Sequence, residues 1–189
     1  MEKSSEIIKD KSKKYLGTED INKLFWKLSI PAIVAQVINM LYNMVDRIYI
    51  GHIKEVGSLA LTGVGVCMPI LIIVSAFASF GAAGGAPRAS IFLGKNDKET
   101  AEKILSGCFF MQIVISLALT AVLLIWGRNL LLSFGASENT ISYAVDYLSI
   151  YAIGTIFVEV TLSMNAFITA QGDAKTAMLT VLLGAVINI

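Results

Sequence analysis

The 189-residue chain is 56% hydrophobic and only 15% charged, and its formal net charge is +1. A soluble domain has roughly a quarter of its residues charged, and a chain of this length cannot enclose so much apolar surface in one core. The composition therefore excludes an ordinary soluble domain and predicts a multi-pass membrane protein surrounded by lipid, while the near-neutral charge gives no indication of a nucleic-acid partner.

The N-terminal segment 1–17 is polar, rich in lysine and without periodicity, which predicts a disordered cytoplasmic tail. No cleavable signal peptide is expected, because the first apolar run is too long and no A-x-A-like site follows it. Thr18 is the predicted N-cap of the first helix, with two acidic residues in its first turn. The first span is predicted at about residues 24–51, with Pro31 as a kink in its early turns.

Further apolar segments follow at regular intervals. Spans are predicted at about residues 58–88, 101–126, 138–171 and 175–189. Thr100 is expected to cap the third span, and Gly172 to follow the end of the fourth. At ~1.5 Å per residue, the last segment is too short to cross a hydrocarbon core of ~30 Å. We therefore expect an N-terminal fragment of a longer protein whose C-terminal part is missing.

The basic residues are distributed unevenly along this pattern. If the N-terminus is inside the cell, twelve of the 15 lysines and arginines fall in cytoplasmic segments and three fall outside. Cytoplasmic loops of membrane proteins carry such an excess of positive charge. The sequence therefore predicts a protein of the cell membrane with a cytoplasmic N-terminus.

Polar side chains form one stripe along the first span. Gln36, Asn39, Asn43 and Asp46 follow one another at spacings of three, four and three, which places them within an arc of roughly 80° on one helix face. Lipid penalises such a stripe, so it is expected to face a bundle interior or a wet cavity. A carboxylate flanked by neutral amides suits a proton or Na⁺, which makes Asp46 the leading candidate for an ion-binding residue. Alternatively, the three amides join helices by hydrogen bonds.

Glu159 is a second acid within apolar sequence, midway along the fourth span. Two placements are open: it shares a cavity with Asp46, or it faces a partner helix that is absent from this fragment.

Other residues in the spans indicate packing rather than chemistry. Cys67 and Cys108 lie in apolar stretches without a CxxC or histidine partner, and they are expected to be buried small residues rather than metal ligands or a disulfide. Gly65, Gly81 and Gly85 are expected to allow close contact between helices. The sequence has no Ser/His/Asp set, HExxH or Walker motif, so no enzyme is predicted.

Several segments carry a resemblance to a known family. The opening span reads LSIPAIVAQVINMLYNMVDRIYIGHI, with an early proline, a late VD pair and a glycine just beyond. The exit of the second helix reads ASIFLGKNDKETA, and later segments read LLSFGASENTISYAVDYLSIYAIG and NAFITAQGDAKTAM. In this order they resemble the corresponding segments of multidrug and toxic compound extrusion (MATE) transporters, along nearly the whole chain after Thr18.

The resemblance implies an all-α membrane protein, a polytopic helical bundle in which residues 18–189 form most of the N-terminal six-helix lobe of a twelve-helix transporter. Such transporters exchange Na⁺ or H⁺ for small organic, often cationic compounds, and no cofactor other than the coupling ion is implied. By motif, Asp46 matches the family's first-helix acid, which binds a proton or cation, and it would be the metal ligand if the ion is Na⁺. Asn188 matches the asparagine that opens the N-x-x-x-D motif of the fifth helix.

The candidate residues fall into two roles. The candidates for binding the ion are Asp46, Asn43 and Asn188. The candidates for lining the substrate cavity are Gln36, Asn39 and Glu159.

Three other functions remain open. A lipid or polysaccharide-precursor flippase shares the architecture but usually lines its cavity with arginines, and here Arg47, Arg88 and Arg128 lie near helix ends. An intramembrane enzyme would need Asp46 and Glu159 within a few ångströms of one another. The last alternative is an inert truncated fragment.

Overall fold

The computed structural model describes residues 19–188, and of Asn188 only the helical backbone; the predicted tail and the predicted cap at Thr18 lie outside the described residues. The described chain forms α2 (Ile21–Gly51), α3 (Gly57–Gly94), α4 (Lys98–Ser133), α5 (Ile141–Ala170) and α6 (Ala174–Asn188). The first four of these helices are long and apolar enough to cross a membrane, and α6 is a shorter apolar helix. The all-α bundle predicted from the sequence is confirmed.

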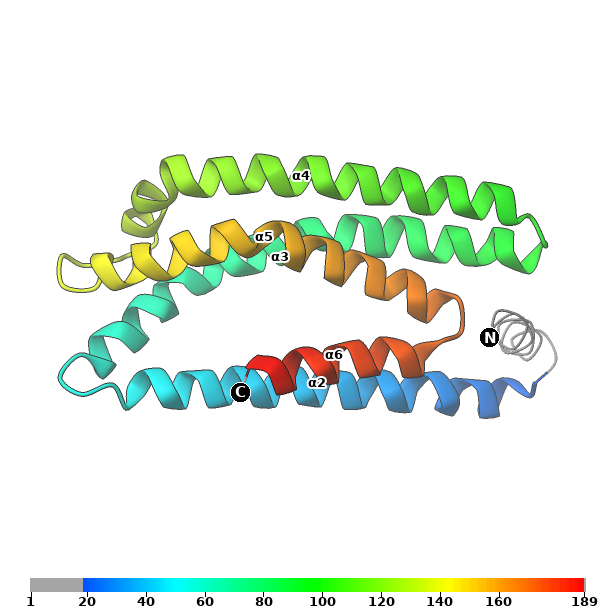
Figure 1. Ribbon diagram of the computed structural model, residues 1–189, viewed down its shortest axis with the longest axis horizontal. Helices are drawn as coiled ribbons and strands as arrows, with labels where there is room; N and C mark the ends of the chain where they lie inside the picture. Colours follow the sequence, from blue (N-terminus) through cyan, green and yellow to red (C-terminus); the bar gives the residue numbers. More distant parts are fainter. Residues whose placement is uncertain (1–18, 189) are drawn as a thin grey trace.

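The helices form two groups (Figure 1). In the three-helix group, α3, α4 and α5 pack extensively against one another. In the helix pair, α2 lies alongside α6. α3 connects the groups, since it starts beside the end of α2 and runs from there into the three-helix group.

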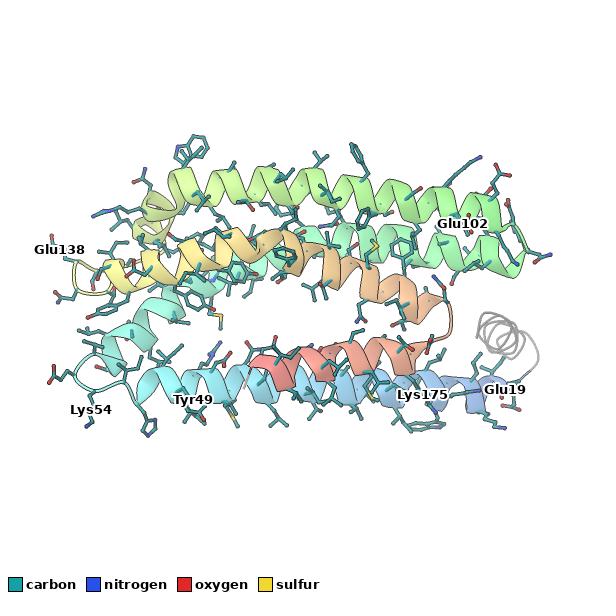
Figure 2. The ribbon with its side chains drawn as sticks, viewed as in Figure 1. Glu19, Tyr49, Lys54, Glu102, Glu138 and Lys175 are labelled. Atoms are coloured by element: carbon teal, nitrogen blue, oxygen red, sulfur yellow. The ribbon has the colours of Figure 1, made fainter. Side chains whose placement is uncertain are left out.

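Charged side chains gather at the two ends of the bundle (Figure 2). Glu19, Glu102 and Lys175 lie at one end, and Lys54 and Glu138 lie at the other. Between the ends, many large apolar side chains of α2 are exposed. An apolar middle between polar ends is what a hydrocarbon layer with water on both sides requires.

Two aspartates cap helices where threonines were predicted. At the start of α2, Asp20 accepts a hydrogen bond from Asn22 N at 2.8 Å. At the start of α4, Asp97 Oδ1 accepts one from Thr100 N at 3.0 Å. The predicted N-cap Thr100 is therefore wrong, and the described start of α2 is capped by Asp20. An aspartate is as strong an N-cap as a hydroxyl residue, and in both places it directly precedes the first helical residue.

α4 extends beyond its predicted end at Trp126 and continues to Ser133. Gly127 lets the helix approach α5 closely, since a Cβ there would lie 3.1 Å from Leu148 Cδ2. One turn later, Leu131 is fully buried. Packing on α5 therefore sustains the helix beyond the interfacial tryptophan at which the sequence suggested its end.

α5 begins at Ile141 rather than near residue 138, because Ser137 and Thr140 form a turn in front of it. In this turn Ser137 N donates to Thr140 Oγ1 at 3.0 Å. Beyond the other end of the helix, Gly172 has a φ of +89°, the left-handed conformation that a glycine adopts readily. Its predicted position just past a helix end is confirmed.

Two of the predicted close-contact glycines lie inside the three-helix group. A Cβ at Gly81 would collide with Ser163 Oγ, and one at Gly85 would lie 2.7 Å from Phe167 Cζ. Both predictions are confirmed. The prediction for Gly65 is wrong, because no described side chain or backbone of another helix comes within 4 Å of its Cβ position.

Candidate functional site

A groove of about 610 Å³ lies between α2, α5 and α6. Its polar walls come from Gln36, Asn39 and Tyr42 of α2, Thr161, Asn165 and Thr169 of α5, and Thr180 of α6. Apolar side chains complete the lining, among them Phe157, Leu162, Met178 and Val181. No charged residue is among the described residues that line it. The groove therefore offers hydrogen bonds and apolar surface without a net charge.

Asn165 joins the two helices on one side of this groove. Its Nδ2 donates to Ala177 O at 3.1 Å and to Thr180 Oγ1 at 2.9 Å. Sequence reasoning did not assign this residue a role. The available signal was an amide within an apolar span, which membrane proteins use to connect helices.

The predicted polar stripe of α2 is divided between two places. Gln36 and Asn39 line the groove. Asn43 is exposed, and its Nδ2 donates to Asn39 O within the same helix at 2.7 Å. Asp46 is half-buried, one turn further along α2.

Asp46 lies next to Arg47, whose side chain extends from α2 to α3. Both Asp46 and Arg47 are within electrostatic range of the Tyr147 hydroxyl of α5, as is Tyr42. Arg47 Nη2 also donates to Met68 Sδ of α3 at 3.4 Å. Asp46 therefore lies one turn beyond Tyr42, where α2 still lines the groove.

Glu159 lies elsewhere, inside the three-helix group. Its side chain is fully buried, and Gln112 Nε2 of α4 donates a hydrogen bond to its Oε2. Ser163 of α5 and Gly81 of α3 complete this buried polar cluster. Glu159 is not among the residues that line the groove. The structure thus places Glu159 against α4, a helix of this chain, rather than against a helix outside it.

Gln112 is the member of this cluster that sequence reasoning missed. It interrupts the apolar run GCFFMQIVISLA of the third span. The signal was the one that singled out the first span, because an amide within an apolar helix needs a partner away from lipid. Its partner Glu159 could not be identified, since the pairing depends on how α4 and α5 are aligned.

Among the residues that the structure describes, no three His, Cys, Asp or Glu side chains come together in a way that would hold a metal ion. The side chain of Asn188, the other motif-based candidate, lies outside the described residues.

Known proteins similar to this chain are membrane transporters. The MatE family model matches residues 31–189. The chain is 24% identical to the multidrug export protein MepA of Staphylococcus haemolyticus, over 96% of this chain and 40% of that protein. It is 20% identical to an FAD transporter of Shewanella oneidensis, over 89% of this chain and 37% of that protein. It therefore spans about two-fifths of the length of these relatives.

Solved structures share the fold. A MOP superfamily transporter from Pyrococcus furiosus superposes with a TM-score of 0.83 at 24% identity, over 92% of this chain and 38% of that one. An outward-facing multidrug resistance MATE family transporter gives the same TM-score, 0.83, with the same coverage. The helices of this chain therefore have the architecture of the N-terminal part of these transporters, as predicted.

Proposed function

This chain belongs to the MatE family, and from that premise we propose that it forms part of a cation-coupled antiporter of the cell membrane, with its N-terminus in the cytoplasm. The antiporter exports amphipathic or cationic drugs and toxic compounds by alternating access, with Na⁺ or H⁺ as the coupling ion. The observation that best supports this proposal is the uncharged polar groove whose α2 wall leads toward Asp46.

The groove suits an amphipathic organic molecule. Its volume of about 610 Å³ lies within the ~300–1,000 Å³ that small-molecule sites occupy. Apolar walls would bury the hydrophobic part of such a molecule, and Gln36, Asn39 and Thr180 would orient its polar groups. The described lining contains no lysine or arginine, which favours this substrate class over the anionic headgroups that a flippase carries. Because the relatives are more than twice as long, a second lobe would supply the opposite wall.

The coupling ion would act at Asp46. A proton or Na⁺ bound there neutralises the half-buried carboxylate of α2. An ion that binds one conformation more tightly than the other shifts the equilibrium between inward-facing and outward-facing states. Asn43 and Asn188 would supply neutral oxygens to the same ion.

Replacing Asp46 with asparagine in the complete natural protein tests this proposal. We expect Asp46→Asn to reduce ion-driven efflux of a fluorescent cationic dye to the level of cells without the protein. Membrane insertion should be unchanged, because the two side chains are nearly the same size. Efflux is measured in proteoliposomes with an imposed Na⁺ or H⁺ gradient, and the gradient that drives it identifies the ion.

The matched control is Asp146→Asn, which removes an exposed acid from α5. This variant should transport like the wild type. Undiminished efflux from Asp46→Asn would show that coupling does not depend on this carboxylate.

A further inference from the structure

Three buried oxygen atoms come together inside the three-helix group without partners. Glu159 Oε1, Gln112 Oε1 and Ser163 Oγ make no hydrogen bond with any described residue. Ser163 follows Glu159 by one helical turn, and a Cβ at Gly81 would collide with Ser163 Oγ and lie 3.3 Å from Gln112 Oε1. Native proteins rarely leave even one buried polar atom unpaired, so three neighbouring ones indicate that a donor is missing.

A count of donors and acceptors identifies the missing donor. If Glu159 is ionised, the Ser163 hydroxyl is the one donor within this trio for the free oxygens of Glu159 and Gln112, so one oxygen stays unpaired. A proton on Glu159 Oε1 supplies the second donor. Gln112 Nε2 donates to Glu159 Oε2, and a protonated Glu159 together with the Ser163 hydroxyl gives the cluster two free donors for its two remaining acceptors, Gln112 Oε1 and Ser163 Oγ.

The orientation of the Gln112 amide does not change this result. If the amide is turned by 180°, its oxygen faces Glu159 Oε2 and its nitrogen faces Ser163. Two acceptors then lie opposite each other, and a proton on Glu159 is again needed between them.

In the described part of the chain, no positively charged side chain lies near enough to compensate the negative charge of an ionised Glu159. The titratable groups near it are Tyr151 on its own helix and Cys108 on α4, one turn before Gln112. On α3, Arg88 is exposed and lies nearer the helix end. No lysine or arginine among the described residues forms an ion pair with Glu159. A buried carboxylate without a counterion favours its neutral form.

We propose that Glu159 is a proton-binding site separate from Asp46, and that its proton stays with the folded protein. The neutral carboxyl group accepts the hydrogen bond from Gln112 that joins α4 to α5. A proton fits this site better than a metal ion, because Gly81 packs directly against Ser163 and none of the described cavities contains these atoms. The proposal does not depend on the transport activity of the protein.

Infrared spectroscopy of the purified natural protein tests for this proton. At neutral pH we expect a carbonyl stretching band of a protonated carboxylic acid that shifts when the protein contains ¹³C-labelled glutamate. Apart from Glu159, the described glutamates are exposed or half-buried, and water-exposed carboxyl groups are ionised at this pH. The band should be lost in Glu159→Gln and retained in the control Asp146→Asn.

Thermal unfolding as a function of pH gives an independent readout. If the folded protein holds a proton that the unfolded chain releases, stability falls as pH rises above the ordinary glutamate value of about 4.3. We therefore expect the melting temperature of the wild type to decrease with pH relative to that of Glu159→Gln, while Asp146→Asn follows the wild type.

Two results would overturn the proposal. One is the absence of a glutamate-labelled acid band from the wild type at neutral pH, which decides the matter even if Glu159→Gln does not fold. The other is a melting temperature that varies with pH in the same way in the wild type and in Glu159→Gln.

Discussion

At the scale of single residues, two amide side chains of this bundle bond a partner on another helix. Gln112 reaches Glu159 across the contact between α4 and α5, and Asn165 reaches Thr180 across the contact between α5 and α6. In hydrocarbon a polar group without a partner is destabilising, so such bonds select which helix faces come together. The two bonds therefore fix α5 against a different neighbour on each side.

The bond from Asn165 predicts a specific loss of stability. In Asn165→Leu, both hydrogen bonds to α6 disappear, and we expect a destabilisation of about 1 kcal/mol, the size of an interhelical hydrogen bond in a membrane. Thermal unfolding in detergent measures it. The control is Asn43→Leu, because Asn43 is exposed and bonds only its own helix. Equal melting temperatures for both variants would show that Asn165 does not hold α6.

The sequence located the polar residues of the candidate site but not their partners. Gln36 and Asn39 could be predicted to face a cavity, because their spacing places them on one helix face and lipid disfavours that face. The amide of Asn43 shares the face but bonds its own backbone, a choice of side-chain conformation that spacing does not determine. The pairing of Glu159 depends on the alignment of two helices, which residue spacing within one helix cannot give.

At the scale of helices, order and type could be predicted from apolar length, whereas several ends could not. α4 continues past Trp126 because its last turns pack on α5, and this contact is a tertiary one. The cap of the same helix was predicted at Thr100, but Asp97 takes that place. Both errors have the same cause. Several neighbouring residues could cap or end the helix, and three-dimensional packing determines which of them does.

The cap of α4 makes stability depend on pH in acid. Bonds from the backbone and then the side chain of Thr100 hold the pKa of Asp97 below its ordinary value of 3.8. A carboxyl group with a lowered folded-state pKa stabilises the protein above its unfolded-state pKa, and this contribution is lost as pH falls through the folded-state pKa. Asp97→Ala should therefore melt a few degrees lower at neutral pH, with a smaller difference in strong acid.

Melting curves at several pH values measure this effect. Glu102→Ala serves as the control, since it removes an exposed acid from the same end of α4 without removing a cap. A deficit of Asp97→Ala that persists unchanged in strong acid would contradict the role of the charged cap.

Two adjacent glycines of α3 differ in how closely the neighbouring helices pack against them. A Cβ at Gly85 would lie 2.7 Å from Phe167 Cζ, whereas none of the described atoms lies within 4 Å of a Cβ at Gly84. We expect Gly85→Ala to destabilise the bundle by roughly 1–3 kcal/mol through overpacking. Gly84→Ala should be neutral or slightly stabilising, because alanine favours the helix. Thermal unfolding of the two variants tests this, and equal effects would contradict the packing.

At the scale of the whole molecule, the helices alternate in direction, so the α2–α3 and α3–α4 connections lie at opposite ends of the bundle. Lys54 lies in the first connection and Lys95 directly after α3, and both are exposed. The uneven distribution of basic residues predicts that the end with Lys95 is cytoplasmic. The orientation is predicted from the sequence, because the arrangement of the helices is compatible with the cytoplasm at either end of the bundle.

Thiol labelling in intact cells tests the orientation. A membrane-impermeant maleimide should label Lys54→Cys in intact cells and should label Lys95→Cys only after the membrane is permeabilised. The unmodified protein is the control, because its native cysteines Cys67 and Cys108 lie within α3 and α4. The reverse labelling pattern would show that the N-terminus is outside.

The pairing of α2 with α6 has a consequence for biogenesis. A ribosome delivers α2 to the membrane before α6, and three long helices are synthesised between them. During that interval the amides of Gln36 and Asn39 have no α6 beside them, so water, the insertion machinery or a passing helix must hydrate or shelter them. α2 therefore acquires its α6 neighbour only after three later helices have been made, and the order of assembly differs from the order of translation.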